Sequence, residues 1–110
     1  MRKAAIYYKD IPAGILTETD EGEYVFQYEE KYVQQHPQQF LTFTMPVSLK
    51  PYTDKRLFPF FEGLIPEGWL LDIASKNWKI NPNDRMGLLL ACCRNCIGAV
   101  SVQPIPQEDE

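Results

Sequence analysis

The sequence has little of what most enzymes and metal-binding proteins need. Its only histidine is His36, and it lacks the glycine-rich motifs that bind nucleotide phosphates. It also lacks the G-x-S-x-G nucleophile motif and the H-R-D and D-F-G motifs of protein kinases. His36 stands beside Pro37 in a glutamine-rich stretch, and no other residue pattern suggests a partner that would orient its ring as a general base. We expect His36 to be a surface residue. We therefore expect no catalytic residues, no enzymatic activity and no cofactor.

Long apolar runs are also missing. No stretch approaches the roughly 18 apolar residues that a membrane span requires. The first eight residues contain two basic residues but too short an apolar stretch for a signal peptide, and they are typical of a strand. The three cysteines form an odd set of neighbours, Cys92, Cys93 and Cys96, which favours free thiols in a reducing compartment. We expect a cytoplasmic protein with no membrane contact.

Positive charge is sparse. Lysine and arginine together number 11, against 15 acidic residues, and the formal net charge is -4. The basic residues are scattered, whereas a protein that holds nucleic acid by itself needs a basic face for the phosphates. We expect no direct binding of nucleic acid.

The first half of the chain has the patterning of antiparallel strands. A hydrophobic content of 45% over 110 residues suffices for one packed core. We expect strands over residues 3–8, 15–19 and 24–29, joined by turns at 10–14 and 20–23, and a fourth strand over 41–45. Residues 30–40 read as a short helical turn or loop, and residues 46–55 as a loop.

The spacing becomes helical after residue 57. We expect a short helix over 59–64 that starts at Pro59, a second over 68–78, and a third from residue 82, capped by Asn81 with Asp84 near its positive end. The third helix should bury one stripe of side chains: Met86, Leu89, Leu90 and Cys93. A closing strand over 98–102 completes an α+β domain over residues 1–103: a small antiparallel meander, about three short helices and one strand. Residues 104–110 form an acidic tail that we expect to be disordered.

Two features near the helices could bear on function. Cys93 and Cys96 form a C-x-x-C motif, which can be redox-active or half of a zinc site. The motif falls at the end of the predicted helix, where the dipole disfavours a thiolate, and a zinc site would lack ligands with standard spacing, so we expect small packed residues and no metal. Trp69 lies beside the stripe of Leu70, Ile73 and Ala74: it is either an exposed binding residue or a core residue on Phe60, Phe61 or Trp78.

Three segments carry a family resemblance. Residues 57–68 (L-F-P-F-F-E-G-L-I-P-E-G), 83–91 (N-D-R-M-G-L-L-L-A) and 97–102 (I-G-A-V-S-V) resemble the N-terminal subdomain 1 of HipA-type serine/threonine kinase toxins, over about residues 3–103. That subdomain has a similar P-F-F-x-x-L-L-P-E-G segment, a D-x-x-x-L-L helix and a closing G-A-V strand. The chain departs from the pattern at Cys93, where family members often have glycine, and at Asn95, where they often have aspartate. We expect this protein to lack the kinase core that follows the subdomain in the toxins.

The resemblance extends to the tripartite HipBST toxin–antitoxin systems, in which a small protein of this kind acts in trans as the antitoxin of a HipT kinase, beside the DNA-binding HipB. It implies an antitoxin that binds and inhibits a HipT-like serine/threonine kinase toxin, within a ternary complex with a HipB-like DNA-binding protein. The residues expected to contact the kinase are Trp69 first, then Glu67 and Asp72, with Pro66 and Gly68 presenting the tryptophan. Two alternatives stay open: an adaptor that bridges kinase and DNA-binding protein without inhibiting, and a redox or metal protein using Cys93 and Cys96.

Overall fold

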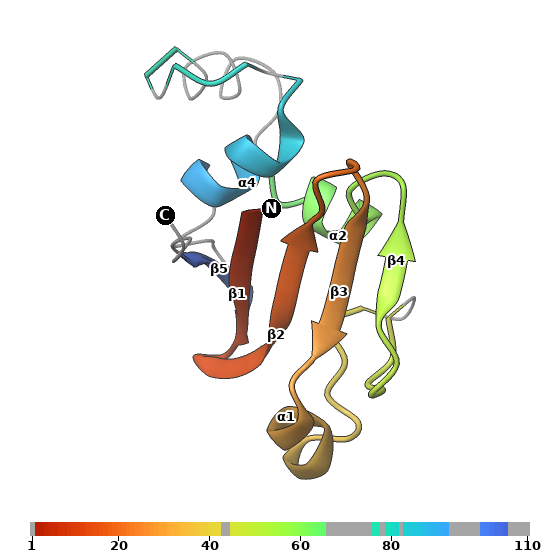
Figure 1. Ribbon diagram of the computed structural model, residues 1–110. Helices are drawn as coiled ribbons and strands as arrows, with labels where there is room; N and C mark the ends of the chain where they lie inside the picture. The colour runs from red at the N-terminus through yellow and green to blue at the C-terminus, as the bar shows by residue number, and fades with distance from the viewer. Residues whose placement is uncertain are drawn as a thin grey trace.

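The computed structural model describes residues 2–42, 45–65, 76–77, 79–81, 83–92 and 100–105. Within them, five strands form one antiparallel sheet in the order β4-β3-β2-β1-β5 (Figure 1). The strands are β1 (Arg2–Tyr8), β2 (Ile11–Glu18), β3 (Tyr24–Tyr28), β4 (Tyr52–Asp54) and β5 (Val100–Ile105). The described helices are α1 (Glu30–Gln35), α2 (Pro59–Glu62) and α4 (Arg85–Cys92). This arrangement confirms the α+β class and the meander, and α1 lies where a short helical turn or loop was expected.

The turn between β1 and β2 is shorter than the predicted turn over residues 10–14. Lys9 and Asp10 have positive φ values of 53° and 66°, which is the backbone of a two-residue hairpin turn. β2 therefore begins at Ile11, and the predicted start at residue 15 was wrong. The pairing shifts between Ile6 and Tyr7, which accommodates one extra residue in β2 as a bulge.

The fourth strand lies later in the chain than predicted. Thr42 and Met45 pair with each other in an isolated bridge, and the Met45 amide donates to the Thr42 carbonyl at 3.0 Å, so these residues face one another across a turn. The strand that extends the sheet is β4, within the segment predicted to be a loop, and it pairs Tyr52 with Phe26. The predicted residues 43 and 44 lie outside the described residues.

The hydroxyls of the buried Tyr28 and the half-buried Tyr52 bind the backbone of the residues before β4, which lie outside the sheet. The Tyr28 hydroxyl accepts from the Leu41 amide at 3.1 Å and donates to the Met45 carbonyl at 2.5 Å. The Tyr52 hydroxyl donates to the Pro46 carbonyl at 2.6 Å. Burial raises the pKa of Tyr28 to about 12, so its hydroxyl remains a donor well above neutral pH.

The helices begin close to where the sequence indicates, with one change of cap. α2 starts at Pro59, as predicted, and ends at Glu62. α4 starts at Arg85, so the predicted cap Asn81 was wrong: the Asp84 side chain accepts from the Gly87 amide at 3.2 Å. Asn81 instead closes the turn before the helix by accepting from the Asn83 amide at 2.8 Å.

The buried side of α4 also differs by one position. Met86, Leu88 and Leu89 are fully buried, whereas the predicted Leu90 is half-buried. Cys93 lies outside the described residues. So does the predicted helix over 68–78 apart from Lys76 and Asn77, both of which are helical.

β5 closes the sheet against β1. It pairs Val102 with Ile6 and runs on through Pro104 to Ile105, two residues beyond the predicted domain end at 103. Residues 98 and 99 of the predicted strand and residues 106–110 of the predicted tail lie outside the described residues. In the described ranges, no helix is long and apolar enough to span a membrane.

The core fills one face of the sheet. Ile6, Leu16, Phe26 and Val102 are fully buried at inward positions of four strands, and Phe61 of α2 packs on Phe26 with ring centroids 5.7 Å apart. The Phe26 ring also sits against Gly14. A Cβ on Gly14 would lie 2.8 Å from Phe26 Cζ and 2.5 Å from the Gln27 carbonyl oxygen, so only glycine fits at this position.

We expect Gly14→Ala to destabilise the fold by about 1–3 kcal/mol, because the added methyl overpacks a closed site against a backbone atom. Gly63→Ala is the matched control. Gly63 ends α2 in a right-handed helical conformation, and a Cβ there would meet its neighbours only at 3.5 Å, so the free energy of unfolding should change by less than about 0.5 kcal/mol. Urea unfolding of both variants measures the difference, and equal stabilities would contradict this account of the core.

Candidate partner-binding surface

The residues predicted to bind a partner lie outside the described part of the chain. They are Pro66, Glu67, Gly68, Trp69 and Asp72. The structure describes the two points between which they run. On one side Ile65, 3% exposed, ends the turn that follows α2, and on the other side Ile80 packs against the core before α4. The chain therefore contacts the same core at Ile65, directly before the predicted binding residues, and again at Ile80 after them.

A salt bridge links α2, which precedes the predicted binding residues, to α4, which follows them. Arg85 is the first residue of α4 and Glu62 is the last residue of α2. The Arg85 guanidinium donates to the Glu62 carboxylate at 3.0 Å. Both side chains are about one third exposed, so solvent weakens the pair, and its main effect is on the relative position of the helices. Figure 1 shows α2 and α4 at one end of the sheet and α1 at the other.

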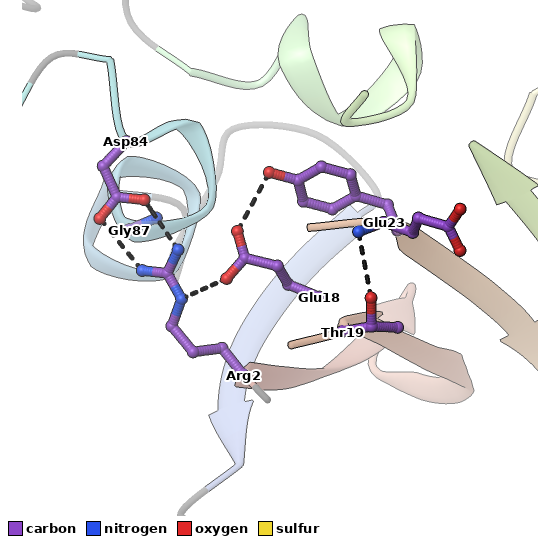
Figure 2. A network of polar contacts seen from close by, with 7 residues as sticks. Arg2, Glu18, Thr19, Glu23, Asp84 and Gly87 are labelled. Atoms are coloured by element: carbon purple, nitrogen blue, oxygen red, sulfur yellow. Dashed lines mark hydrogen bonds and ion pairs between the residues drawn. The ribbon is translucent and has the colours of Figure 1, made fainter. Parts of the chain in front are cut away.

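A second polar cluster joins α4 to the sheet. Arg2 of β1 binds the Asp84 carboxylate through two parallel hydrogen bonds of 3.0 and 2.8 Å, and its Nε donates to Glu18 of β2 at 2.6 Å (Figure 2). The Tyr24 hydroxyl of β3 donates to the other Glu18 oxygen at 3.1 Å. Three strands are thus linked to the residue that caps α4.

The charges in this cluster reinforce one another. The Arg2 guanidinium, by hydrogen bonding, holds the pKa of Asp84 below its ordinary value, although partial burial opposes the shift. The two carboxylates raise the pKa of Arg2 further above its already high value. Burial, and then the hydrogen bond to Glu18, raise the pKa of Tyr24. At neutral pH Arg2 is therefore charged, Asp84 is ionised and the Tyr24 hydroxyl is protonated, as their contacts require.

Sequence reasoning found one member of this cluster and missed the rest. Asp84 was placed at the positive end of the helix, and the structure adds that it is the cap. Arg2 gave no signal, because a basic residue at the start of a first strand has no pattern that points to residue 84. Glu18 and Tyr24 likewise become partners only through the pairing of β1 with β2 and of β2 with β3.

The remaining candidate residues do not form a described reactive site. His36 ends α1, and its ring packs on Tyr32 with centroids 5.2 Å apart. Cys93 and Cys96 lie outside the described residues. Among the residues that are described, no three histidine, cysteine or acidic side chains are grouped closely enough to hold a metal ion.

The fold and its packing define the class: an α+β domain with a one-sided core. Comparison with known proteins identifies the family. A family model described as HipA N-terminal domain matches residues 4–103. The chain therefore belongs to the HipA N-terminal domain family, which relates it to toxin–antitoxin kinase systems.

A solved structure agrees with this assignment, and two other proteins are similar in sequence. A solved structure described as the N-terminal domain of HipA toxin superposes with a TM-score of 0.74 at 27% identity, and the match covers 98% of this chain and 96% of that one. An uncharacterized protein of Haemophilus influenzae is 34% identical over 90 residues, which cover 82% of this chain and 80% of that protein. Y4dM of Sinorhizobium fredii, whose name describes it as a proposed kinase, is 27% identical over 105 residues, covering 89% of this chain but only 25% of Y4dM.

We expect Arg2→Met to lower the free energy of unfolding by about 1 kcal/mol at pH 7, since the ion pairs are about one third exposed. Because Asp84 has a lowered pKa in the folded state, its contribution to the free energy of unfolding is complete above the ordinary carboxyl pKa of about 3.9. That contribution disappears as the pH falls through the lowered pKa. The difference between wild type and Arg2→Met should therefore shrink below about pH 4.

Unfolding in urea at pH 7 and pH 3 measures this difference. Arg2→Lys is the conservative control: it keeps the charge but loses the paired hydrogen bonds, so its stability should lie between the other two. A gap between wild type and Arg2→Met that is unchanged at pH 3 would show that the Asp84 pair is not its cause.

Proposed function

We propose that this chain is a HipS-like antitoxin, which binds a HipT-like serine/threonine kinase toxin in trans and inhibits it. The observation that carries the proposal is the match to the HipA N-terminal domain over residues 4–103, nearly the whole chain. In Y4dM the matching region is a quarter of a longer protein named as a proposed kinase, so this domain occurs in one chain with a large additional part. A surface that packs on such a part within one chain can pack on the same part as a separate protein.

The relative from Haemophilus influenzae supports a free-standing role for the domain. The match covers 80% of that protein, so little of it lies outside the domain. A separate protein lacks the high effective concentration that a covalent tether provides, and the interface must therefore supply the affinity by itself. Such interfaces usually rely on a few large anchors that fill pockets on the partner.

The proposed anchor is Trp69, within the segment that connects Ile65 to Ile80. The structure supports this choice indirectly, because both ends of the segment are attached to the core and α2 is tied to α4 by Glu62 and Arg85. A segment with fixed ends loses less conformational entropy on binding than a free one. Glu67 and Asp72 are acidic neighbours suited to basic groups near a kinase phosphate site.

Inhibition of a kinase requires no chemistry from the antitoxin. Phosphoryl transfer depends on the positioning of nucleotide, metal and acceptor, so a protein that displaces any of them stops the reaction. We propose accordingly that the chain has no enzymatic activity and binds no cofactor. A HipB-like DNA-binding protein is the proposed third member of the complex.

Kinase activity of a purified HipT-like partner tests the proposal. Its rate of phosphoryl transfer should fall to background as this chain is added in stoichiometric amounts, without a third protein. If the chain binds the kinase and leaves its rate unchanged, the adaptor role is correct and the antitoxin role is wrong. If it neither binds nor inhibits, the proposed partner is wrong.

Trp69→Ala separates the anchor from a core residue. We expect at least a thirtyfold loss of affinity for the kinase, about 2 kcal/mol, with an unchanged melting temperature. Thermal unfolding followed by titration against the kinase measures both quantities on one preparation. A variant that melts like wild type and still inhibits would exclude Trp69 as the anchor, and an unfolded variant would make it a core residue.

A further inference from the structure

The outward face of the sheet differs from an ordinary solvent-exposed face. Strand pairing places one set of residues on the side opposite the core, since residues that pair directly share a face. Each of them is half-buried or exposed. They are Lys3, Ala5, Tyr7, Pro12, Ile15, Thr17, Val25, Gln27, Thr53, Ser101, Gln103 and Ile105.

Charge is depleted on this face, here called the open face. Lys3 is the only charged residue among the described outward positions just named, in a chain in which 24% of residues are charged. Ala5 and Ile15 pair directly at the middle of the face. The partner of Ile15 on β3 is Gln27, and the apolar Val25 lies diagonally, opposite Thr17. A sheet face in water usually alternates polar residues outward, whereas the centre of a protein interface loses charge and gains apolar area. The open face matches the second in its low charge and in the apolar pair of Ala5 and Ile15 at its middle.

A hollow of about 340 Å³ opens at one end of this face. Its lining is Tyr7, Asp10, Ser101 and Gln103, and Tyr7 pairs directly with Ser101 across β1 and β5. The lining combines a carboxylate, a hydroxyl, an amide and a phenol ring. The other charged residue of the turn, Lys9, has its ammonium 5.6 Å from the ring centroid of Tyr8, the residue that alternation places on the opposite side from Tyr7. Hydrogen-bond acceptors beside an aromatic ring suit a guanidinium group, which binds carboxylates and stacks on aromatic faces.

One exposed apolar residue, Leu49, adjoins the open face beside β3. Leu49 is 55% exposed, and its carbonyl accepts from the outward-pointing Gln27 side chain at 3.2 Å. The loop that holds it is fixed by the Tyr52 hydroxyl bound to Pro46 and by the Ser48 hydroxyl bound to the Lys50 amide. An exposed leucine on a fixed loop contributes little to folding and is well placed to extend an interface.

We infer that the open face is a docking surface for the partner kinase, and that the hollow at Tyr7 and Asp10 receives an arginine side chain of that kinase. The inference rests on the proposed function for the identity of the partner. The partner's matching surface is an aliphatic patch with a protruding arginine beside it, which complements an apolar centre and an acidic hollow. No residue of this face belongs to the segment 66–72, so the docking surface is tested independently of Trp69.

The Asp10 carboxylate in the hollow can be tested by a single substitution. Asp10→Asn removes the carboxylate charge and keeps the shape, and asparagine tolerates the left-handed backbone at this position. We expect about tenfold weaker binding to the kinase, with an unchanged melting temperature and a weaker dependence of affinity on salt. Glu21→Gln is the matched control: it makes the same charge change in an exposed turn at the opposite end of the strands, and it should bind like wild type.

The apolar centre is tested in the same titration. Ile15→Lys places a charge in the middle of the open face and should weaken binding by more than about tenfold, whereas Ile15→Val keeps the apolar surface and should bind like wild type. Thermal unfolding of each variant confirms that the sheet is intact.

The outcomes separate this inference from the proposed function. If wild type inhibits the kinase and both Asp10→Asn and Ile15→Lys bind as tightly as wild type, the docking surface is wrong and the antitoxin role stands. Equal losses in Asp10→Asn and Glu21→Gln would mean a general charge effect, which also overturns the hollow as an arginine site. If wild type fails to bind the kinase, both the role and this occupant are wrong.

Discussion

The contact between Phe26 and Gly14 decides which face of the sheet is buried. The ring occupies the space that any larger residue at position 14 would fill, and this places β2 and β3 in one register. A shift of one residue would turn every side chain of the strand to the other face. Phe61 of α2 then packs on the same ring, so the helical layer depends on this register as well. One packed face and one open face are the direct consequence.

Ion pairs, as well as apolar packing, fix the positions of α2 and α4 on the sheet. Arg2 binds the cap of α4, and Arg85 at the start of that helix binds the end of α2. These pairs are partly exposed, so their value lies less in stability than in the geometry that they select. The Arg85–Glu62 pair links the helices that precede and follow the predicted binding segment. Arg2 links α4 to the sheet by binding both Asp84 and Glu18.

The strands with alternating or β-branched sequences were predictable, and the features set by distant residues were not. Residues 24–28 alternate clearly, and Pro59 marks the start of α2, so both were found from local patterns. The apolar alternation at 41–45 was misleading. The backbone groups of Leu41 and Met45 bond to the buried Tyr28 hydroxyl and do not pair with a strand of the sheet. The helix cap was misplaced by three residues, because asparagine and aspartate are equally good caps locally, and the contact of Asp84 with the distant Arg2 leaves no local signal. The family resemblance was carried by the segments around α2 and α4 and is confirmed by the match over residues 4–103.

The central claim is that this domain acts by covering part of a kinase, with its open sheet face turned toward the partner. Hydroxyl-radical footprinting of the chain, free and bound to the kinase, tests it most directly, because it reports the solvent exposure of individual side chains. The account predicts that Tyr7 and Ile15 react in the free protein and become protected in the complex, while exposed residues of the β2–β3 turn, such as Glu23, keep their reactivity. Unchanged reactivity of Tyr7 and Ile15 in a complex that inhibits the kinase would contradict it.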